Sequence, residues 1–374
     1  MNILYYIHSL EIGGAEKVVV DNIKTLIQRG NDVKLVVNYQ TNSFLEKDLK
    51  SQGVEIFPLF KKKATTKLEA IILKLYRSLF STKKTWKLIL DKTKPDIIHI
   101  NTFMDKFYPH NIPANKVVYT FHSEVERSLK LGTKKNLKAL TDFSKNGGCF
   151  FALTNKIAEQ IKQRFETNNI FVIPNGVDIA TIKENKLNRT AFLDNLNIPT
   201  DAFVVGHVGR FNPVKNHKFL ISIFSEIEKA NKNSYLLLIG DGTPTEKALI
   251  KEQIKNLKLD DKVKFLGIRK DATAIMSVLD ALILPSLSES FSLVLVEAQI
   301  HGIRCIASTG VPEDVICNKN CFRIELTSSA YDWALKTLSY DLREQSTDIN
   351  KFDIHTIAQQ LEAAYQRILN GESS

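Results

Sequence analysis

The chain has 374 residues, which is long for one ordinary hydrophobic core and fits two domains of about 150–190 residues each. Its composition, 44% hydrophobic and 25% charged with no low-complexity tract and no short repeat, excludes a disordered chain and a repeat protein. The formal net charge is +10, and residues 1–175 hold 28 Lys and Arg against 16 Asp and Glu, so the whole positive excess lies in the first half.

In chain order, short apolar runs alternate with stretches of helical periodicity, which is the pattern of βα units around a parallel sheet. The first run follows Met1 without the basic start of a signal peptide, and no run approaches the roughly 18 residues of a membrane span. The strands expected in the first half are 2–7, 33–38, 54–58, 96–100, 116–121, 149–153 and 170–173. Helices are expected between them, including 15–29, closed by Gly30, and 127–145.

The same rhythm starts again after residue 200. The expected strands there are 202–208, 235–239, 263–266, 281–284, 303–307 and 321–325, and the expected helices are 216–231, 245–257, 272–279, 292–301 and 328–342. The polar stretch 178–200 between the halves is the predicted linker. The sequence therefore predicts an α/β chain of two Rossmann-like domains, 1–177 and 198–350, followed by a last helix at 354–370.

Two cations follow the first expected strand of the second half. Arg210 and Lys215 lie between that strand and a helix that begins near Asn216, at the sheet edge where α/β proteins bind ligands. A planar guanidinium and a point-charge ammonium suit a diphosphate. The spacing alone also fits two solvated loop cations, so the context makes the pair a candidate diphosphate clamp.

Two glutamates flank the start of the expected helix 292–301. Glu289 follows a strand that ends before Pro285, and Glu297 lies on the helix among apolar residues. A carboxylate on a largely apolar helix costs free energy unless it has a partner. Ribose hydroxyls are one suitable partner, and a basic residue of the core is the alternative.

The first half offers weaker candidates. Gly13 and Gly14 open the helix after the first strand, where backbone N–H groups can approach an anion, although a plain tight turn fits equally well. His122 ends the strand 116–121, but a lone histidine is more often structural. No G-x-G-x-x-G occurs, which disfavours an NAD(P)-dependent dehydrogenase, and no Asp-x-Asp occurs, so neither a metal nor a cofactor is expected. The four cysteines are expected to be reduced structural thiols.

Seven segments in this order resemble the GT4 retaining glycosyltransferases, over nearly the whole chain. They are Gly13–Glu16, Thr120–Ser123, Ile173–Asp178, Val208–Asn216, Gly240–Gly242, Phe265–Gly267 and the pair Glu289 and Glu297. The resemblance implies the GT-B fold, in which two Rossmann-like domains face a central cleft. The first domain would bind the acceptor and receive the helix 354–370, and the second would bind the nucleotide sugar.

The resemblance also implies residue roles. Arg210 and Lys215 would hold the donor diphosphate with Gly14 close by, and Glu297 would hold the ribose. The remaining implied contacts are the base with the backbone of Gly267, Ile268 and Arg269, and the transferred sugar with Glu289, Phe291, Ser292, Leu293 and His122. Ser292 departs from the family, because many members have Gly there, and 309–313 replaces the commoner Gly-Gly turn, as in enzymes of capsule and exopolysaccharide synthesis.

The expected activity is therefore metal-independent hexosyl or N-acetylhexosaminyl transfer from a nucleoside-diphosphate sugar, UDP being the expected nucleotide. The expected acceptor is a glycan or an undecaprenyl-diphosphate-linked glycan in the bacterial cytoplasm. Retention without an evident nucleophile suits front-face attack, in which the leaving phosphate accepts the acceptor's proton. A UDP-sugar epimerase of the same fold is the nearest alternative.

The basic segment 61–94 bears on partners. It carries eleven Lys and Arg against only Glu69 and Asp91, and the sequence pI is about 9.2. A nucleic-acid-binding protein is disfavoured, because these cations alternate with Ile, Leu and Trp at helical spacing and form no known reader motif. We expect a helix that lies on the anionic inner face of the plasma membrane. A core-facing helix with solvated charges is the alternative.

Overall fold

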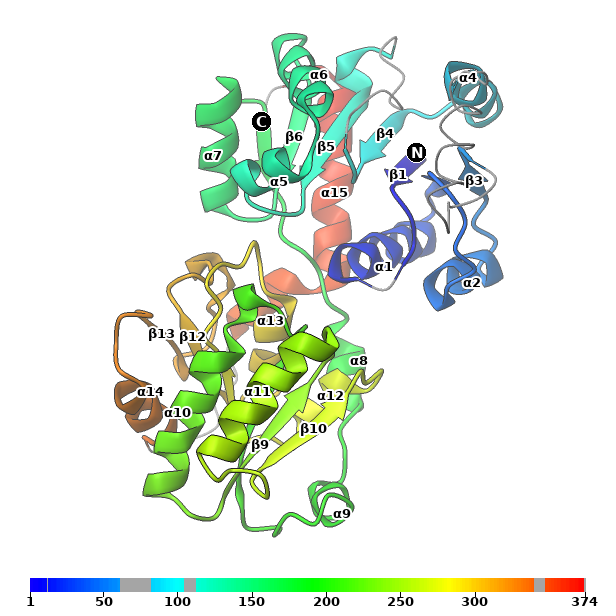
Figure 1. Cartoon of the computed structure of the whole chain (residues 1–374). Coiled ribbons are helices and arrows are strands. Elements are labelled where there is room, and N and C mark those ends of the chain that lie inside the picture. The colour runs from blue at the N-terminus through cyan, green and yellow to red at the C-terminus, as the bar shows by residue number, and fades with distance from the viewer. Residues whose placement is uncertain (12, 61–81, 104–111, 340–346, 373–374) are drawn as a thin grey trace. The chain divides into compact units, whose positions relative to one another are not determined.

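A computed structural model describes the chain from Met1 to Glu372, except residues 12, 61–81, 104–111 and 340–346. The chain divides into two compact units (Figure 1). Unit 1 comprises Met1–Gly176 and Ile354–Ser374, and unit 2 comprises Val177–Asp353. Each unit contains one parallel sheet covered by helices, so the α/β class predicted from the sequence is confirmed.

The sheet of unit 1 has seven strands in the order β3-β2-β1-β4-β5-β6-β7. The strands are β1 (Asn2–Ile7), β2 (Asp32–Val37), β3 (Ile56–Pro58), β4 (Ile97–Ile100), β5 (Val117–Phe121), β6 (Cys149–Ala152) and β7 (Ile170–Val172). The central strands are almost entirely buried, whereas the edge strands β3 and β7 are partly exposed. Such continuous apolar runs are typical of a parallel sheet with helices on both faces.

The helices of unit 1 include one from the far end of the chain. They are α1 (Gly14–Gln28), α2 (Phe44–Ser51), α4 (Thr82–Thr93), α5 (Val125–Leu131), α6 (Lys134–Lys145), α7 (Asn155–Phe165) and α15 (Ile354–Leu369). Figure 1 shows α15 beside the sheet, next to α1, and its apolar residues join the same core cluster as those of β1 and α1. The predicted return of the last helix to the first domain is thus confirmed.

A buried polar network fastens α15 to the sheet. The Tyr365 hydroxyl lies 2.6 Å from Nδ1 of His99 on β4 and 3.0 Å from the Tyr5 hydroxyl on β1. The other ring nitrogen of His99 lies 2.6 Å from Oγ1 of Thr120 on β5. Burial lowers the pKa of His99 to about 3, so the ring is neutral and offers one donor and one acceptor. Both ring nitrogens are therefore satisfied within the core.

The sheet of unit 2 has six strands in the order β10-β9-β8-β11-β12-β13. The strands are β8 (Phe203–Val208), β9 (Ser234–Ile239), β10 (Val263–Gly267), β11 (Ala281–Leu284), β12 (Arg304–Ser308) and β13 (Cys321–Ile324). The helices are α8 (Ile179–Glu184), α9 (Arg189–Asp194), α10 (His217–Ala230), α11 (Pro244–Asn256), α12 (Ala272–Met276), α13 (Leu293–Ile300) and α14 (Ala330–Leu338). The strand order reverses between β8 and β11, and such a switch point is where doubly wound sheets bind nucleotides.

Two local expectations were wrong. The helix expected at 127–145 is two helices, because α5 ends at Gly132 and the Thr133 side chain caps α6 by accepting a hydrogen bond from the Asn136 N–H. The predicted linker 178–200 contains α8 and α9 and belongs to unit 2. Arg189 of α9 fastens it there, donating to Asp280 at 2.8 Å and to the Ala202 carbonyl at 2.7 Å.

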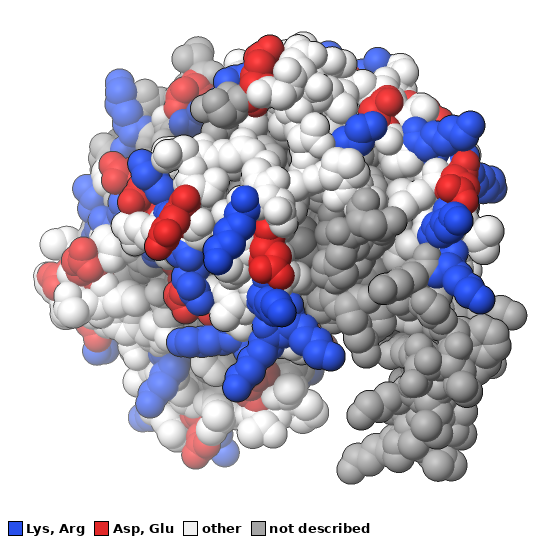
Figure 2. Space-filling model, turned by 90° about the horizontal axis from the view of Figure 1, so that it is seen from above, with Lys and Arg blue, Asp and Glu red and all other residues white. Residues whose placement is uncertain are grey.

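The basic segment is described only from residue 82. In α4, Trp86 and Ile89 are buried, and the Trp86 ring packs edge-on against Tyr6. The apolar face of this part of the segment therefore packs in the core, which agrees with the alternative of a core-facing helix with solvated charges. Lys84, Lys87 and Leu88 are exposed. Figure 2 shows Asp and Glu lying among Lys and Arg on the described part of one face of the molecule. Residues 61–81 lie outside the described part of the chain.

No helix among the described residues has both the length and the apolar character required to cross a bilayer.

Candidate active site

The candidate site of unit 2 is built from loops at the carboxyl ends of its strands. Residues 209–216 follow β8, and residues 285–292 follow β11, the two central strands of the sheet. The loops after β9 and β12 contact these two through backbone hydrogen bonds, and the end of β10 contacts the loop after β9. Strands that pair in parallel end at the same edge, which brings residues distant in sequence together there.

The loop after β8 is shaped by two asparagines. The Asn212 side chain accepts a hydrogen bond from the Lys215 N–H at 3.1 Å and caps a single turn, Pro213–Lys215. Asn216 then adopts a left-handed conformation, with φ of 54°, before α10 begins. This geometry fixes the backbone of Lys215. Arg210 is exposed, and no other described residue binds its guanidinium, so the group is available to a ligand.

Lys215 and Glu289 form an ion pair. Lys215 Nζ lies 2.6 Å from Glu289 Oε1, and the side chains are only 18% and 14% exposed. The two residues are 74 positions apart in sequence. Partial burial strengthens such a pair relative to one on the surface. Two candidate residues that the sequence suggested separately are thus in direct contact.

Glu289 is also held by its own loop and by the loop after β12. Ser286 Oγ donates to the same Oε1 at 2.7 Å, and the Glu289 N–H donates to the Gly310 carbonyl at 2.9 Å. A Cβ at Gly310 would lie 2.5 Å from the Leu287 carbonyl oxygen, so only glycine allows this approach. Ser308 Oγ donates to the Ser286 carbonyl. The sequence assigned no role to Ser286 or Ser308, although both lie near strand ends, and it marked Gly310 only as part of the turn 309–313.

A close backbone approach joins the loops after β8, β9 and β10. Gly240 has φ of +133°, and a Cβ there would lie 2.0 Å from the Gly209 carbonyl oxygen. The Gly240 N–H donates to the Gly267 carbonyl at 2.8 Å, and the Phe211 N–H donates to the Asp241 carbonyl at 2.9 Å. The glycines of the family segments Gly240–Gly242 and Phe265–Gly267 therefore hold the edge of the site in shape.

The turn into α13 contains strained backbone. Ser292 has φ of 80°, which explains why many members of the resembling family have Gly at this position. The Phe291 ring is buried and packs edge-on against Phe352, which anchors the turn. Leu293 begins the helix and Glu297 lies one turn further along it, both half-buried.

The candidate base-binding residues differ in exposure. Gly267 ends β10 with φ of +68°, and the Ile268 side chain that follows is 71% exposed. Arg269 donates from two nitrogens to Asp271, at 2.7 and 2.6 Å, so its guanidinium is already paired.

Two candidates belong to unit 1. Gly14 is the exposed first residue of α1, with no atom within 4 Å of where a Cβ would stand. His122, just beyond β5, is half-buried, and its Nε2 lies 2.8 Å from Asn101 Oδ1. Burial lowers the pKa of His122 to about 4, which keeps it neutral. Asn101, which follows β4 and orients this ring, was missed from the sequence.

Two buried histidines lie beneath the Lys215 loop. The rings of His207 and His217 meet edge-on with centroids 4.6 Å apart, and Phe211 stacks on His217 at 4.2 Å. Burial and the nearby charge of Lys215 lower the pKa of His217 to about 4, and burial holds the pKa of His207 well below its usual value. Both rings are therefore neutral, which avoids repulsion of the Lys215 ammonium.

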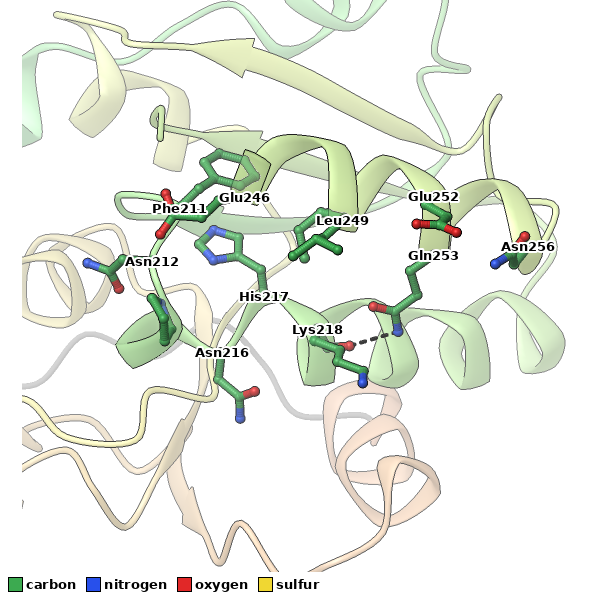
Figure 3. Close-up of a pocket in the computed structure, with 12 residues that line it drawn as sticks. Phe211, Asn212, Asn216, His217, Lys218, Glu246, Leu249, Glu252, Gln253 and Asn256 are labelled. Carbon is green, nitrogen blue, oxygen red and sulfur yellow. Dashed lines mark hydrogen bonds between the residues drawn. The ribbon is translucent and has the colours of Figure 1, made fainter. Parts of the chain in front are cut away.

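A hollow of about 610 Å³ opens between α10 and α11, beside the loop after β8 (Figure 3). Leu249 and Ile250 line it with Asn216, Asn256 and other polar residues. The Gln253 amide spans the two helices, donating to the Lys218 carbonyl at 2.9 Å. Phe211, Asn212, Pro213 and Asn216 of the loop after β8 also line it, whereas Arg210, Lys215 and Glu289 do not.

The described residues contain no cluster of three or more His, Cys, Asp or Glu side chains suited to a metal ion. All four cysteines have free thiols, and burial raises the pKa of Cys149 to about 12.

Two family models match adjacent parts of the chain. One, described as "Glycosyltransferase Family 4", matches residues 12–181, and the other, "Glycosyl transferases group 1", matches residues 188–336. Together the two models cover most of the chain, and the chain belongs to the glycosyltransferases that they describe. The family resemblance drawn from the sequence is thereby confirmed.

Bacterial proteins named as glycosyltransferases match parts of the chain. A protein named as the glycosyltransferase EpsF of Bacillus subtilis strain 168 is 30% identical over 174 residues, which are 46% of this chain and 45% of EpsF. An Escherichia coli enzyme named UDP-Gal:alpha-D-GlcNAc-diphosphoundecaprenol alpha-1,3-galactosyltransferase is 29% identical over 63% of this chain and 62% of that one. The matches thus span about half to three fifths of these relatives.

A solved structure shares the fold over almost the whole chain. Anabaena HepE, in complex with UDP and glucose, matches with a TM-score of 0.74 at 22% identity, covering 97% of this chain and 99% of HepE. The fold of this glycosyltransferase is therefore GT-B, as the sequence predicted.

Proposed function

We propose that this chain is a retaining glycosyltransferase that moves a hexosyl or N-acetylhexosaminyl group from a UDP-sugar to a glycan or an undecaprenyl-diphosphate-linked glycan. The observation that carries the proposal is the Lys215–Glu289 pair, together with the exposed Arg210 on the same loop as Lys215, at the switch point of a Rossmann-like sheet. HepE, which shares the fold, binds UDP and glucose. The Escherichia coli relative is named for transfer to a lipid-linked acceptor.

In the proposed reaction the bond between the anomeric carbon and the phosphate oxygen breaks, and an acceptor hydroxyl bonds to the same face of that carbon. The acceptor's proton passes to the leaving phosphate, so the products are the glycoside and UDP. Negative charge grows on the leaving oxygen, and Arg210 and Lys215 stabilise it more in the transition state than in the ground state. We propose that these two cations replace a metal ion.

The other residues would bind and orient the donor. Glu289 would hold hydroxyls of the transferred sugar, and Glu297 would accept from the ribose. The turn Phe291–Leu293 would lie against the same sugar, and the backbone at Gly267–Arg269 would meet the base. In unit 1, Gly14 would approach the diphosphate and His122 would contact the sugar as a neutral hydrogen-bonding group.

We also propose that the enzyme works in the cytoplasm, at the inner face of the plasma membrane. An acceptor on a lipid diphosphate would be presented there. On the described part of the segment 61–94, Lys84, Lys87 and Leu88 are exposed on one side of α4. Each lysine near an anionic surface contributes about 1 kcal/mol to binding.

The test is a panel of labelled UDP-sugars, each incubated with the protein and a lipid-linked acceptor. We expect one donor to raise the Tm and to yield a product that keeps the anomeric configuration. Conversion of the donor to another UDP-sugar without an acceptor would indicate the epimerase instead. Absence of both reactions, with no UDP-dependent rise in Tm, would refute the proposal.

A further inference from the structure

Glu289 has two hydrogen-bond donors on one oxygen. Lys215 Nζ lies 2.6 Å from Oε1, and Ser286 Oγ lies 2.7 Å from the same atom. Ser286 is fully buried, whereas the side chains of Lys215 and Glu289 retain 18% and 14% exposure. The lysine can therefore move toward a ligand, but the serine cannot.

The proposed function requires one donor to Glu289 that can leave it and one that stays. A donor diphosphate competes with Glu289 for the Lys215 ammonium, because both are anions. Once Lys215 turns to the phosphate, Glu289 is a partly buried carboxylate that has lost its ionic partner. A buried acceptor left without a donor costs about 1–3 kcal/mol, more when charged. The Ser286 hydroxyl is the donor that stays.

The backbone at Ser286 is held by neighbouring loops. The Ser286 carbonyl accepts a hydrogen bond from Ser308 Oγ at the end of β12. The next residue, Leu287, donates its N–H to the Val214 carbonyl at 2.7 Å, which ties this loop to the one that carries Lys215. The backbone that carries the hydroxyl is thus held in place by two neighbouring loops, which favours a preorganised site.

We infer that Ser286 is a positioning residue for sugar transfer: its hydroxyl holds the Glu289 carboxylate in place when Lys215 shifts to the donor diphosphate. The inference rests on the proposed function. Ser286 touches neither the diphosphate nor the acceptor in this account, and it acts only through Glu289. Its loss should therefore affect turnover and spare donor binding.

The test is a double-mutant cycle of Ser286→Ala and Glu289→Gln, with Ser222→Ala on the outer helix α10 as the control. We expect Ser286→Ala to lower kcat about tenfold, the cost of roughly one hydrogen bond to a charged group, with donor KM within about twofold of wild type. The rise in Tm on adding UDP should be unchanged. Because Ser286 acts through Glu289, the double variant should be no slower than Glu289→Gln alone.

Fully additive losses in kcat, or a wild-type kcat for Ser286→Ala, would overturn the inference. So would a loss of the UDP-dependent Tm shift in Ser286→Ala, since that would assign the hydroxyl to binding. A wild-type protein that neither transfers sugar nor responds to UDP would refute the proposed function instead. The two failures are therefore distinguishable.

Discussion

Replacing Tyr365 with Phe should destabilise unit 1 by removing one hydroxyl from the buried network. That hydroxyl serves His99 at 2.6 Å and Tyr5 at 3.0 Å, and none of the three residues is more than 2% exposed. Water cannot replace the lost contacts. Each partner left unsatisfied costs about 1–3 kcal/mol, so we expect a loss of about 2–5 kcal/mol in the free energy of unfolding.

The assay is differential scanning calorimetry with urea unfolding. For a unit of this size each kcal/mol lowers the Tm by about 2–4 °C, so the transition of unit 1 should fall by roughly 4–20 °C. Tyr5→Phe removes only one of the two bonds and should cost less. Tyr331→Phe is the control, because that ring is 60% exposed on unit 2. A Tyr365→Phe variant as stable as the control would show that the network contributes nothing.

Four further outcomes are expected. Arg210→Ala and Lys215→Ala should each lower kcat, because each variant loses about 2–4 kcal/mol of transition-state stabilisation. The control Lys218→Ala, at an exposed lysine, should not change kcat. Near-normal kcat at saturating donor in both Arg210→Ala and Lys215→Ala would place the clamp elsewhere. Glu297→Gln should mainly raise donor KM and Glu289→Gln mainly lower kcat, and exchanged phenotypes would exchange their roles. Activity should survive EDTA, and a requirement for Mg²⁺ or Mn²⁺ that salt cannot replace would demand a metal site. As pH falls below about 6.5, four histidines gain protons in the unfolded state but stay neutral in the folded state. The free energy of unfolding, measured in urea, should therefore fall by up to about 1.4 kcal/mol per pH unit for each histidine. A flat profile from about pH 6.5 to 5 would contradict the buried neutral state. These histidines are His99, His122, His207 and His217.

The basic segment also gives an expected outcome for membranes. Vesicles containing phosphatidylglycerol or cardiolipin should bind the protein reversibly, and salt should weaken the binding. The variant replaces Lys61, Lys62, Lys63, Lys83, Lys84 and Lys87 with Ser, and it should bind less in a sedimentation assay and act less on a lipid-linked acceptor. Equal sedimentation of variant and wild type would leave these lysines as solvated surface only. Slow donor hydrolysis should be nearly unchanged in either case.

Local patterns determined much of the fold. The strands β4 and β11 coincide closely with the apolar runs 97–100 and 281–284, because a strand buried on both faces needs nearly every side chain to be apolar. The break at Gly132 and Thr133 was missed, although a glycine followed by a capping residue is a local stop and start signal. Cap chemistry acts over three or four residues, so a closer reading of the sequence could have found it.

Contacts between distant residues required the tertiary structure. The sequence suggested Lys215 and Glu289 as separate candidates, but only the pairing of β8 with β11 brings the two charges to 2.6 Å. Ser286 lies only three positions from Glu289, and its hydrogen bond to that residue is local, but the strand pairing brings Lys215 to the same carboxylate oxygen. Likewise, Tyr365 reaches His99 across 266 positions because α15 packs on the first sheet.

For the segment 82–93, too, the sequence left open which surface covers its apolar face. Its amphipathic pattern predicts one apolar face, and a bilayer and a protein core are equally good partners for such a face. The contact between Trp86 and Tyr6 of β1 decided for the core in this stretch. Hydrophobic periodicity records that a face must be covered, because burial is non-directional; which surface covers it depends on the packing of the whole chain.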